Sequence, residues 1–302
     1  MERIKGLIDI NICYRDRPTE LGLLLESLRH QTYQKFDIYV SDDVSGISID
    51  KYHFLNCLFS KLREDGHRIY INRNEFAHGV SKNRQKLVDI SMNEGHGEFI
   101  CRLDDDVIVE SDYLDKLLQV IDAGYDLASG VTPPIMNPVW KREIDYVKPI
   151  INEVILDETG KIIKNGDDCG HFYLTNEIIP THHFRSCALY KKELHDKGVD
   201  YVNRLTKHGF REEQIFSFKA IIKGFKLGVH TGAVVWHLLT PSGGERFSNS
   251  NQLVSMNQKM FIETTTEMFK KYGNFIDEYN KKLKIKRPPI DPLELRKENN
   301  LI

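Results

Sequence analysis

The amino-acid sequence predicts an α/β fold with a Rossmann-like, mostly parallel central sheet flanked by helices. Between residues 8 and 121, short apolar segments with strand character alternate with longer segments whose apolar residues recur at helical spacing. Several of the apolar segments also end directly in polar or acidic loops. Ligands of such sheets bind beyond the carboxyl ends of the strands, so these loops are where we expect a functional site.

The first half of the chain repeats a unit of strand, loop and helix. Ile8 opens the first apolar segment, and Leu21, Leu24, Leu25 and Leu28 then follow at helical spacing. Strands are predicted at 8–14, 36–40, 69–71 and 98–103, and helices at 19–31, 54–62, 80–92 and 113–121.

The second half is less regular. Residues 143–163 alternate polar and apolar side chains around a turn at 157–160, which predicts a small β insertion in the form of a hairpin. A helix at 212–223 and a strand at 226–236 then restore the α/β order. We therefore predict one domain over residues 1–245, followed by a lysine-rich, helical C-terminal extension at 246–302.

Composition excludes some partners. Forty-two basic residues stand against 44 acidic ones, for a formal net charge of -2, so binding to nucleic acid is not expected. The five cysteines are scattered and form no C-x-x-C pair, which favours reduced thiols. The first residues lack the pattern of a signal peptide, so we expect a cytoplasmic protein, with peripheral contact at the inner face of a membrane left open.

Three adjacent carboxylates, Asp104, Asp105 and Asp106, follow the apolar segment that ends at Leu103. Carboxylates packed this closely repel one another unless a cation is present, and their hard oxygen atoms suit Mg²⁺ or Mn²⁺ bridging to substrate phosphates. A solvated loop that caps the following helix is an alternative of about equal weight.

Three further polar groups have the same ambiguity. Asp42 follows the second strand and can accept a hydrogen bond from a nucleobase or cap a turn. Glu212 and Glu213 open a predicted helix, where one of them can take a proton from an attacking hydroxyl or simply favour the helix dipole. His237 closes an apolar strand, as a metal ligand or as a satisfied polar group.

Taken in order, these features resemble the inverting glycosyltransferases of family 2, which have the GT-A fold. Residues 42–45 are similar to the family's acidic motif at a strand end, and 79–84 to its glycine-containing basic segment. Residues 104–106 are similar to its D-x-D element, 212–213 to the acidic pair that opens a helix, and His237 to its late histidine. The resemblance covers residues 6–240 and divides the domain into a nucleotide-binding half at 1–130 and a sugar- and acceptor-binding half at 131–245.

The resemblance implies a role for each matching residue. Glu213 falls at the position of the catalytic base, with Glu212 as a rival, and Asp106 would bind the metal together with His237. In the nucleotide-sugar site, Asp42 would contact the base, Asp104 would lie near the ribose, and Asp105 has no firm role. The whole site would comprise Tyr14, Arg15, Asp42, Arg84, Asp104 and Asp105.

Two positions depart from the family pattern. Glu213 stands where aspartate is usual, so its longer side chain changes the reach of the base. Val44 stands where glycine is usual, so the turn after Asp43 is expected to differ.

Two more segments are candidates for substrate contacts. Residues 240–246 contain two glycines and Arg246, which suits a lid that closes over the donor phosphates, with a plain surface loop as the alternative. The resemblance places His182, His183 and Arg185 in a wall facing the sugar or the acceptor. A separate zinc site there lacks matching cysteines.

The function expected from the resemblance is a metal-dependent, inverting hexosyl- or N-acetylhexosaminyltransferase. It would move a sugar from a nucleotide diphosphate donor, UDP by preference, to a hydroxyl of a glycan or other acceptor, as in polysaccharide biosynthesis, with Mn²⁺ or Mg²⁺ as cofactor. A sugar-nucleotide nucleotidyltransferase is the first alternative, but 15–18 lack the glycines of its phosphate loop. A non-catalytic carbohydrate-binding protein on the same fold is the second.

Overall fold

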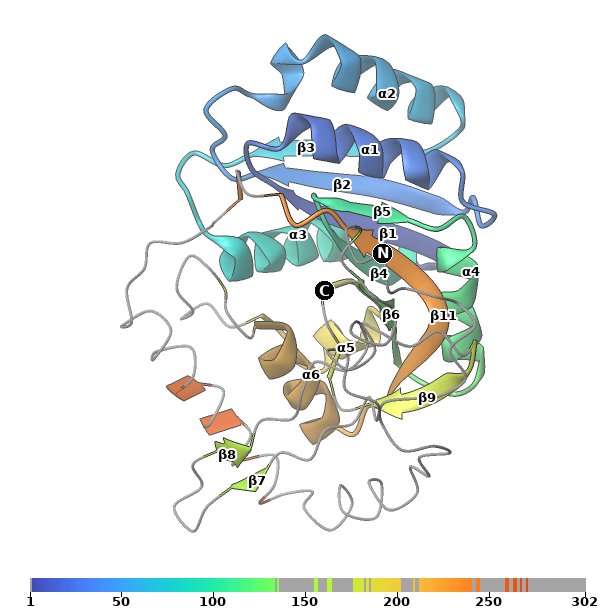
Figure 1. Ribbon diagram of the computed structural model, residues 1–302, viewed down its shortest axis with the longest axis vertical. Helices are drawn as coiled ribbons and strands as arrows, with labels where there is room; N and C mark the ends of the chain where they lie inside the picture. Colours follow the sequence, from blue (N-terminus) through green and yellow to red (C-terminus); the bar gives the residue numbers. More distant parts are fainter. Residues whose placement is uncertain are drawn as a thin grey trace, which may run out of the picture.

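The structure, a computed structural model, describes residues 2–133, 135, 155–156, 162–164, 176–181, 183–184, 186–201, 209, 212–240, 243–244, 259–260, 263–264, 267 and 270. Within these residues, nine strands form one sheet in the order β3-β2-β1-β4-β10-β6-β11-β5, with β9 paired to β11 (Figure 1). The strands are β1 Ile4–Tyr14, β2 Phe36–Asp42, β3 Ile69–Arg73, β4 Gly97–Asp104, β5 Val107–Val109, β6 Leu127–Val131, β9 Ile178–Thr181, β10 Ala188–Lys191 and β11 Leu227–His237.

The helices lie on both faces of this sheet. Figure 1 shows α1 and α2 on one side of the strands and α3 on the other. The helices are α1 Pro18–Arg29, α2 His53–Glu64, α3 Val80–Glu94, α4 Tyr113–Asp122, α5 Glu193–Asp196 and α6 Glu212–Ile222, with a short 3-10 helix at Ile49–Lys51. The α/β class and each strand and helix predicted in the first half are therefore confirmed.

Strand direction divides the sheet into two parts. The neighbours β3, β2, β1 and β4 are all parallel, as alternating strands and helices predict. Beyond β4, the strand β10 runs antiparallel between β4 and β6, while β11 is parallel to β6 and antiparallel to β5 and β9. The short strands β5, β6, β9 and β10 were not predicted from the sequence.

Alternating side chains of the buried strands supply two cores. On β4, Cys101 and Leu103 belong to the cluster that also holds the leucines of α1 and α4, whereas Ile100, just before Cys101, belongs to a second cluster with Phe216 of α6 and Val88 of α3. Successive side chains of a strand point to opposite faces, so α1, α2 and α4 cover one face and α3, α5 and α6 cover the other.

The carboxyl ends of three parallel strands meet at one edge of the sheet. In the ladder, Cys13 of β1 pairs with Asp104 of β4 and with Ser41 of β2, and Tyr14 pairs with Asp42. The acidic residues that follow β2 and β4 in the sequence are thereby brought to the same edge, which is the edge where parallel sheets bind ligands.

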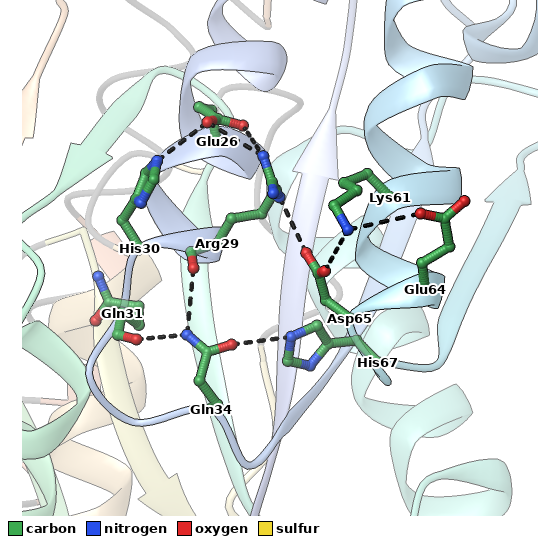
Figure 2. A network of polar contacts seen from close by, with 9 residues as sticks. All are labelled: Glu26, Arg29, His30, Gln31, Gln34, Lys61, Glu64, Asp65 and His67. Atoms are coloured by element: carbon green, nitrogen blue, oxygen red, sulfur yellow. Dashed lines mark hydrogen bonds and ion pairs between the residues drawn. The ribbon is translucent and has the colours of Figure 1, made fainter.

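The opposite ends of the strands are held by a polar network (Figure 2). Asp65, just after α2, lies 3.1 Å from Arg29 Nε at the end of α1 and 2.8 Å from Lys61 Nζ. Arg29 also contacts Glu26 at 2.9 Å. The network joins the segments that lead into β2 and β3, through the residues Glu26, Arg29, His30, Gln31, Gln34, Lys61, Glu64, Asp65 and His67. It ties two helices together at a distance from the acidic edge.

The predicted β insertion and the C-terminal extension lie mostly outside the described residues. The short strands β7 Ile155–Leu156 and β8 Ile162–Lys164 pair antiparallel, as the hairpin around 157–160 predicts. Described positions of the extension are helical, and Met260 packs against the core beside α6. Among the described residues, no helix has the length and apolarity needed to cross a bilayer. The described cysteines, Cys13, Cys57, Cys101 and Cys187, are free thiols.

A buried ion pair joins β1 to the turn after β10. Lys192 Nζ lies 2.6 Å from Asp9 Oδ2, and their side chains are 1% and 0% exposed. The same ammonium donates to the carbonyl oxygens of Ser91 and Gly95, and Asp9 Oδ1 accepts from the Gly97 amide. The pair therefore fixes the end of α3 against the start of β4.

Replacing Lys192 with methionine is expected to lower the free energy of unfolding by about 3 to 5 kcal/mol, because Asp9 is left as a buried charge without a counter-ion. Lys191→Met is the matched control. Lys191 pairs with Asp126 at 2.8 Å, but their side chains are 31% and 22% exposed, so its loss should cost less than about 1 kcal/mol. Urea denaturation measures both, and equal costs would contradict the expectation.

Candidate active site

A pocket of about 340 Å³ opens at the carboxyl edge of the sheet. Its walls come from the ends of β1, β2 and β4, the starts of α3 and α6, and the end of β11. The lining residues are Cys13, Tyr14, Arg15, Arg17, Asp43, Gly79, Val80, Asn83, Arg84, Arg102, Asp104, Asp105, Asp106, Ser186, Gly209, Glu212, Glu213, His237 and Gly244. The elements of the two halves of the chain thus share one cavity.

Three predicted residues come together in it. Ligand atoms of Asp104, Asp106 and His237 all lie within 4.8 Å of one another, and His237 Nε2 is 3.3 Å from Asp106 Oδ1. The chain turns back after β4, so that β5 pairs antiparallel with β11 and places His237 opposite Val107. The Leu238 amide also donates to the Asp106 carbonyl at 2.9 Å. Strand pairing therefore brings a residue far along the sequence to the acidic triplet.

Asp104 is held as a carboxylate. Arg84 Nη2 lies 2.5 Å from its Oδ1, and the Ser186 hydroxyl donates to its Oδ2. Burial by itself would raise the pKa of Asp104, but the Arg84 and Arg102 guanidiniums hold that pKa well below its usual range. Asp104 is consequently ionised at physiological pH.

Glu212 is part of a buried ion network. Both of its oxygens accept hydrogen bonds from Arg102, Oε1 from Nη2 at 2.7 Å and Oε2 from Nη1 at 3.0 Å. Arg84 Nε also lies 2.8 Å from Oε1 of Glu212. Its side chain is 3% exposed. Arg102 also lies over the rings of Phe184 and Tyr201. Both oxygens of the Glu212 carboxylate therefore form ion pairs within the protein.

Glu213, the next residue, is half-buried and lines the pocket. It stands in the first turn of α6, a helix whose start is set by the network around Glu212 and by the Glu212 amide, which donates to the Gly209 carbonyl at 2.9 Å. Of the two acids that open α6, Glu212 is buried and held by Arg84 and Arg102, whereas Glu213 is the more exposed.

The two aspartates at the end of β2 lie differently relative to the pocket. Asp42 is 1% exposed and lies outside the pocket lining, where its oxygens accept from the Ser45 amide at 2.8 Å and from Arg73 at 2.9 Å. Asp43 lines the pocket instead. The turn differs as expected from Val44, which adopts a φ of 60°, a region that glycine enters far more readily than valine.

Asp43 orders the loop before α3. Its oxygens accept from the amides of His78 and Gly79 and from Asn74 Nδ2, all at 2.8 Å. This brings the N-terminus of α3 to the pocket, and the positive end of a helix favours a phosphate group. We had not predicted this residue, although it directly follows Asp42 in the same strand-end motif.

Arg17 is the second residue that sequence reasoning missed. It precedes Pro18 at the start of α1, and its Nη1 lies 2.8 Å from Asp105 Oδ1 and 3.1 Å from Asp106 Oδ2. Asp105, which had no firm role, therefore faces the loop after β1. The sequence did contain a signal for Arg17, because it is a basic residue between the end of a strand and a proline that opens a helix.

The other predicted residues are distributed as follows. Tyr14 and Arg15 line the pocket, as does Gly244 of the predicted lid segment. His183 lies outside the pocket lining, and its ring forms a T-shaped pair with Phe218. His182, Arg185 and Arg246 lie outside the described residues.

The sequence pattern of the family described as "Glycosyl transferase family 2" matches residues 9–197 of the 302 in this chain. The chain belongs to glycosyl transferase family 2. The matched residues carry most of β1, all of β2 and β4, and the acidic triplet, whereas Glu213 and His237 of the pocket lie beyond the matched range. No protein among those with curated descriptions matches the chain.

Solved structures similar to this one are GT-A glycosyltransferases, and the predicted fold is thereby confirmed. GalNAc-T7 with UDP, GalNAc and Mn²⁺ has a TM-score of 0.63 at 16% identity, over 98% of this chain and 55% of that one. S. aureus TarS has a TM-score of 0.53 at 14% identity, over 94% and 46%. TarS 1–349 in complex with UDP-GlcNAc has 0.54 at 14%, over 94% and 76%. The chain spans about half the length of GalNAc-T7 and of the longer TarS chain.

Proposed function

We propose that the chain is a metal-dependent, inverting glycosyltransferase that moves a sugar from a nucleotide diphosphate donor, UDP-linked by preference, to a hydroxyl of a carbohydrate acceptor. The observation that carries the proposal is a single pocket with Asp104, Asp106 and His237 on one wall and Glu213 at the start of α6. UDP is the nucleotide of choice because the similar structures of GalNAc-T7 and TarS contain UDP or UDP-GlcNAc.

The donor set supports a divalent cation. Two carboxylates and one imidazole whose ligand atoms lie within 4.8 Å form a compact group of hard and borderline ligands. The imidazole favours Mn²⁺ over Mg²⁺, which takes oxygen ligands almost exclusively and keeps several waters. When bound, such a cation supplies Lewis-acid stabilisation of the negative charge on a departing diphosphate.

The protein residues have separate tasks in the proposed reaction. Asp43 positions the start of α3, and the positive end of this helix would favour the donor phosphates. Arg84 and Arg102 hold Asp104 and Glu212 in place at the pocket. The glycosyl bond to the diphosphate breaks as the acceptor oxygen attacks the anomeric carbon, and Glu213 accepts the proton of the acceptor hydroxyl. Attack from the face opposite to the leaving group inverts the anomeric configuration.

A thermal-shift screen of UDP, GDP, CMP and dTDP, each with Mn²⁺ or with EDTA, tests the proposal. We expect UDP with Mn²⁺ to raise the melting temperature most, because a ligand at about a hundred times its Kd stabilises the folded state by about 2.7 kcal/mol. Stabilisation by metal-free CMP alone would contradict it. So would release of pyrophosphate from a nucleoside triphosphate and a sugar phosphate, which marks a nucleotidyltransferase.

A further inference from the structure

Arg17 is buried at the junction of three segments that are distant in the sequence. Its side chain is 8% exposed and reaches Asp105 and Asp106 in the turn after β4. Its Nη2 lies 3.4 Å from the Gly243 carbonyl, beyond the end of β11. A Cβ on Gly243 would meet Arg17 Cγ at 2.5 Å and the Asp16 carbonyl at 2.7 Å, so the close approach requires glycine. Arg17 is thus enclosed by its own loop after β1, by the turn after β4 and by the segment beyond β11.

Both oxygens of Asp105 accept hydrogen bonds from the loop after β1. Arg17 donates to its Oδ1 at 2.8 Å, and the Arg15 amide donates to its Oδ2 at 3.1 Å. With both oxygens occupied in this way, Asp105 anchors the loop, which explains why it is not part of the compact group of Asp104, Asp106 and His237. Arg17 also offsets the repulsion that adjacent carboxylates exert on each other in a buried site.

The two oxygens of Asp106 face different partners. Arg17 Nη1 lies 3.1 Å from Oδ2, while His237 Nε2 lies 3.3 Å from Oδ1. An ion pair at one oxygen restricts rotation of the carboxylate, so the other oxygen stays turned toward His237. Partners behind metal ligands generally act in this way, by orienting the ligand rather than touching the metal.

We infer that Arg17 is a positioning residue for the metal-binding group: by holding Asp105 and one oxygen of Asp106, it keeps the other Asp106 oxygen aimed at the space shared with Asp104 and His237. The inference rests on the proposed metal site, and it connects that site to the loop after β1. Arg17 and Asp105 act as one unit, in which Asp105 fixes Arg17 and Arg17 fixes Asp106.

Mn²⁺ binding to the protein alone, measured from the EPR signal of free Mn²⁺ without any nucleotide, tests this role directly. Arg17→Met is expected to raise the Kd for Mn²⁺ by about 10- to 100-fold, the usual effect of losing a partner of a metal ligand. Arg17→Lys keeps one cationic donor but not the fork that spans two carboxylates, so it should recover part of the affinity.

A double variant separates positioning from stability. Arg17→Met alone leaves Asp105 buried without its counter-ion, which can destabilise the loop. Arg17→Met/Asp105→Asn removes that charge, so its melting temperature should return toward the wild-type value while its Kd for Mn²⁺ stays raised. Arg73→Met is the matched control, because it removes a 2.9 Å pair with buried Asp42 outside the pocket and should leave Mn²⁺ binding unchanged.

The outcomes distinguish the inference from the function on which it rests. Asp106→Asn must weaken Mn²⁺ binding, and wild-type affinity in that variant would overturn the metal site and the role of Arg17 with it. If Asp106→Asn loses binding but the folded double variant binds Mn²⁺ like the wild type, only the inference about Arg17 is overturned. Tighter binding in the double variant would likewise overturn it, since Arg17 would then be a competing cation.

Discussion

Glu213→Gln is expected to lower kcat by about 10²- to 10⁴-fold while donor affinity and melting temperature stay near the wild-type values. Glutamine keeps the size of the side chain but cannot accept the proton of the acceptor hydroxyl. The side chain is half-buried and lines the pocket. Steady-state kinetics with the donor that stabilises the protein best would measure the loss.

Glu212→Gln is the matched control for this prediction, because it makes the same change one residue earlier. Here the expected effect is on stability, since Arg102 and Arg84 would lose the buried carboxylate that offsets both of them. Breaking a buried pair in this way costs about 3 to 5 kcal/mol. A stable Glu212→Gln protein without turnover, beside an active Glu213→Gln protein, would reverse the roles of the two acids.

Asp106→Asn is expected to lower kcat/KM by roughly a thousandfold, because Lewis-acid stabilisation of a leaving diphosphate is worth several kcal/mol. An amide oxygen replaces an anionic ligand at the centre of the group that Asp104 and His237 complete. The remaining turnover should no longer respond to Mn²⁺. Turnover in a series of Mn²⁺ concentrations shows both effects.

Asp112→Asn serves as a control for charge alone. Asp112 stands at the start of α4, outside the pocket, and pairs with Lys116 on a side chain that is 48% exposed. Its substitution should leave kcat/KM nearly unchanged. If both variants lost activity equally, the effect of Asp106 would reflect net charge and not a ligand.

The parallel half of the sheet could be predicted because its information is local. Strands β1 to β4 are short segments rich in apolar residues, and the helices between them carry their apolar residues at helical spacing. Strand β10 was missed because nothing near Ala188–Lys191 specifies that it inserts antiparallel between β4 and β6. Its place depends on partners more than fifty residues away, which a local pattern does not contain.

The same distinction applies to the site. The resemblance to the family predicted Asp106 and His237 as metal ligands and Asp104 near the ribose. Each of the three ends a strand or follows one, and strand ends converge. Arg17, Asp43 and Ser186 were missed because their partners come from other segments.

One sign of the network around Glu212 was present in the sequence. Arg102 lies in an otherwise apolar strand, and a buried charge requires a counter-charge. The arginine indicated that an acidic partner existed, although it did not indicate which residue supplied it.

Calorimetric titration of UDP into the wild type with Mn²⁺, the wild type with EDTA, and Asp106→Asn with Mn²⁺ tests the proposed donor site most directly. We expect heat of binding in the first titration and a loss of at least about tenfold in affinity in the other two. Equal affinity in all three titrations would contradict a metal-dependent nucleotide-sugar site built on Asp104, Asp106 and His237.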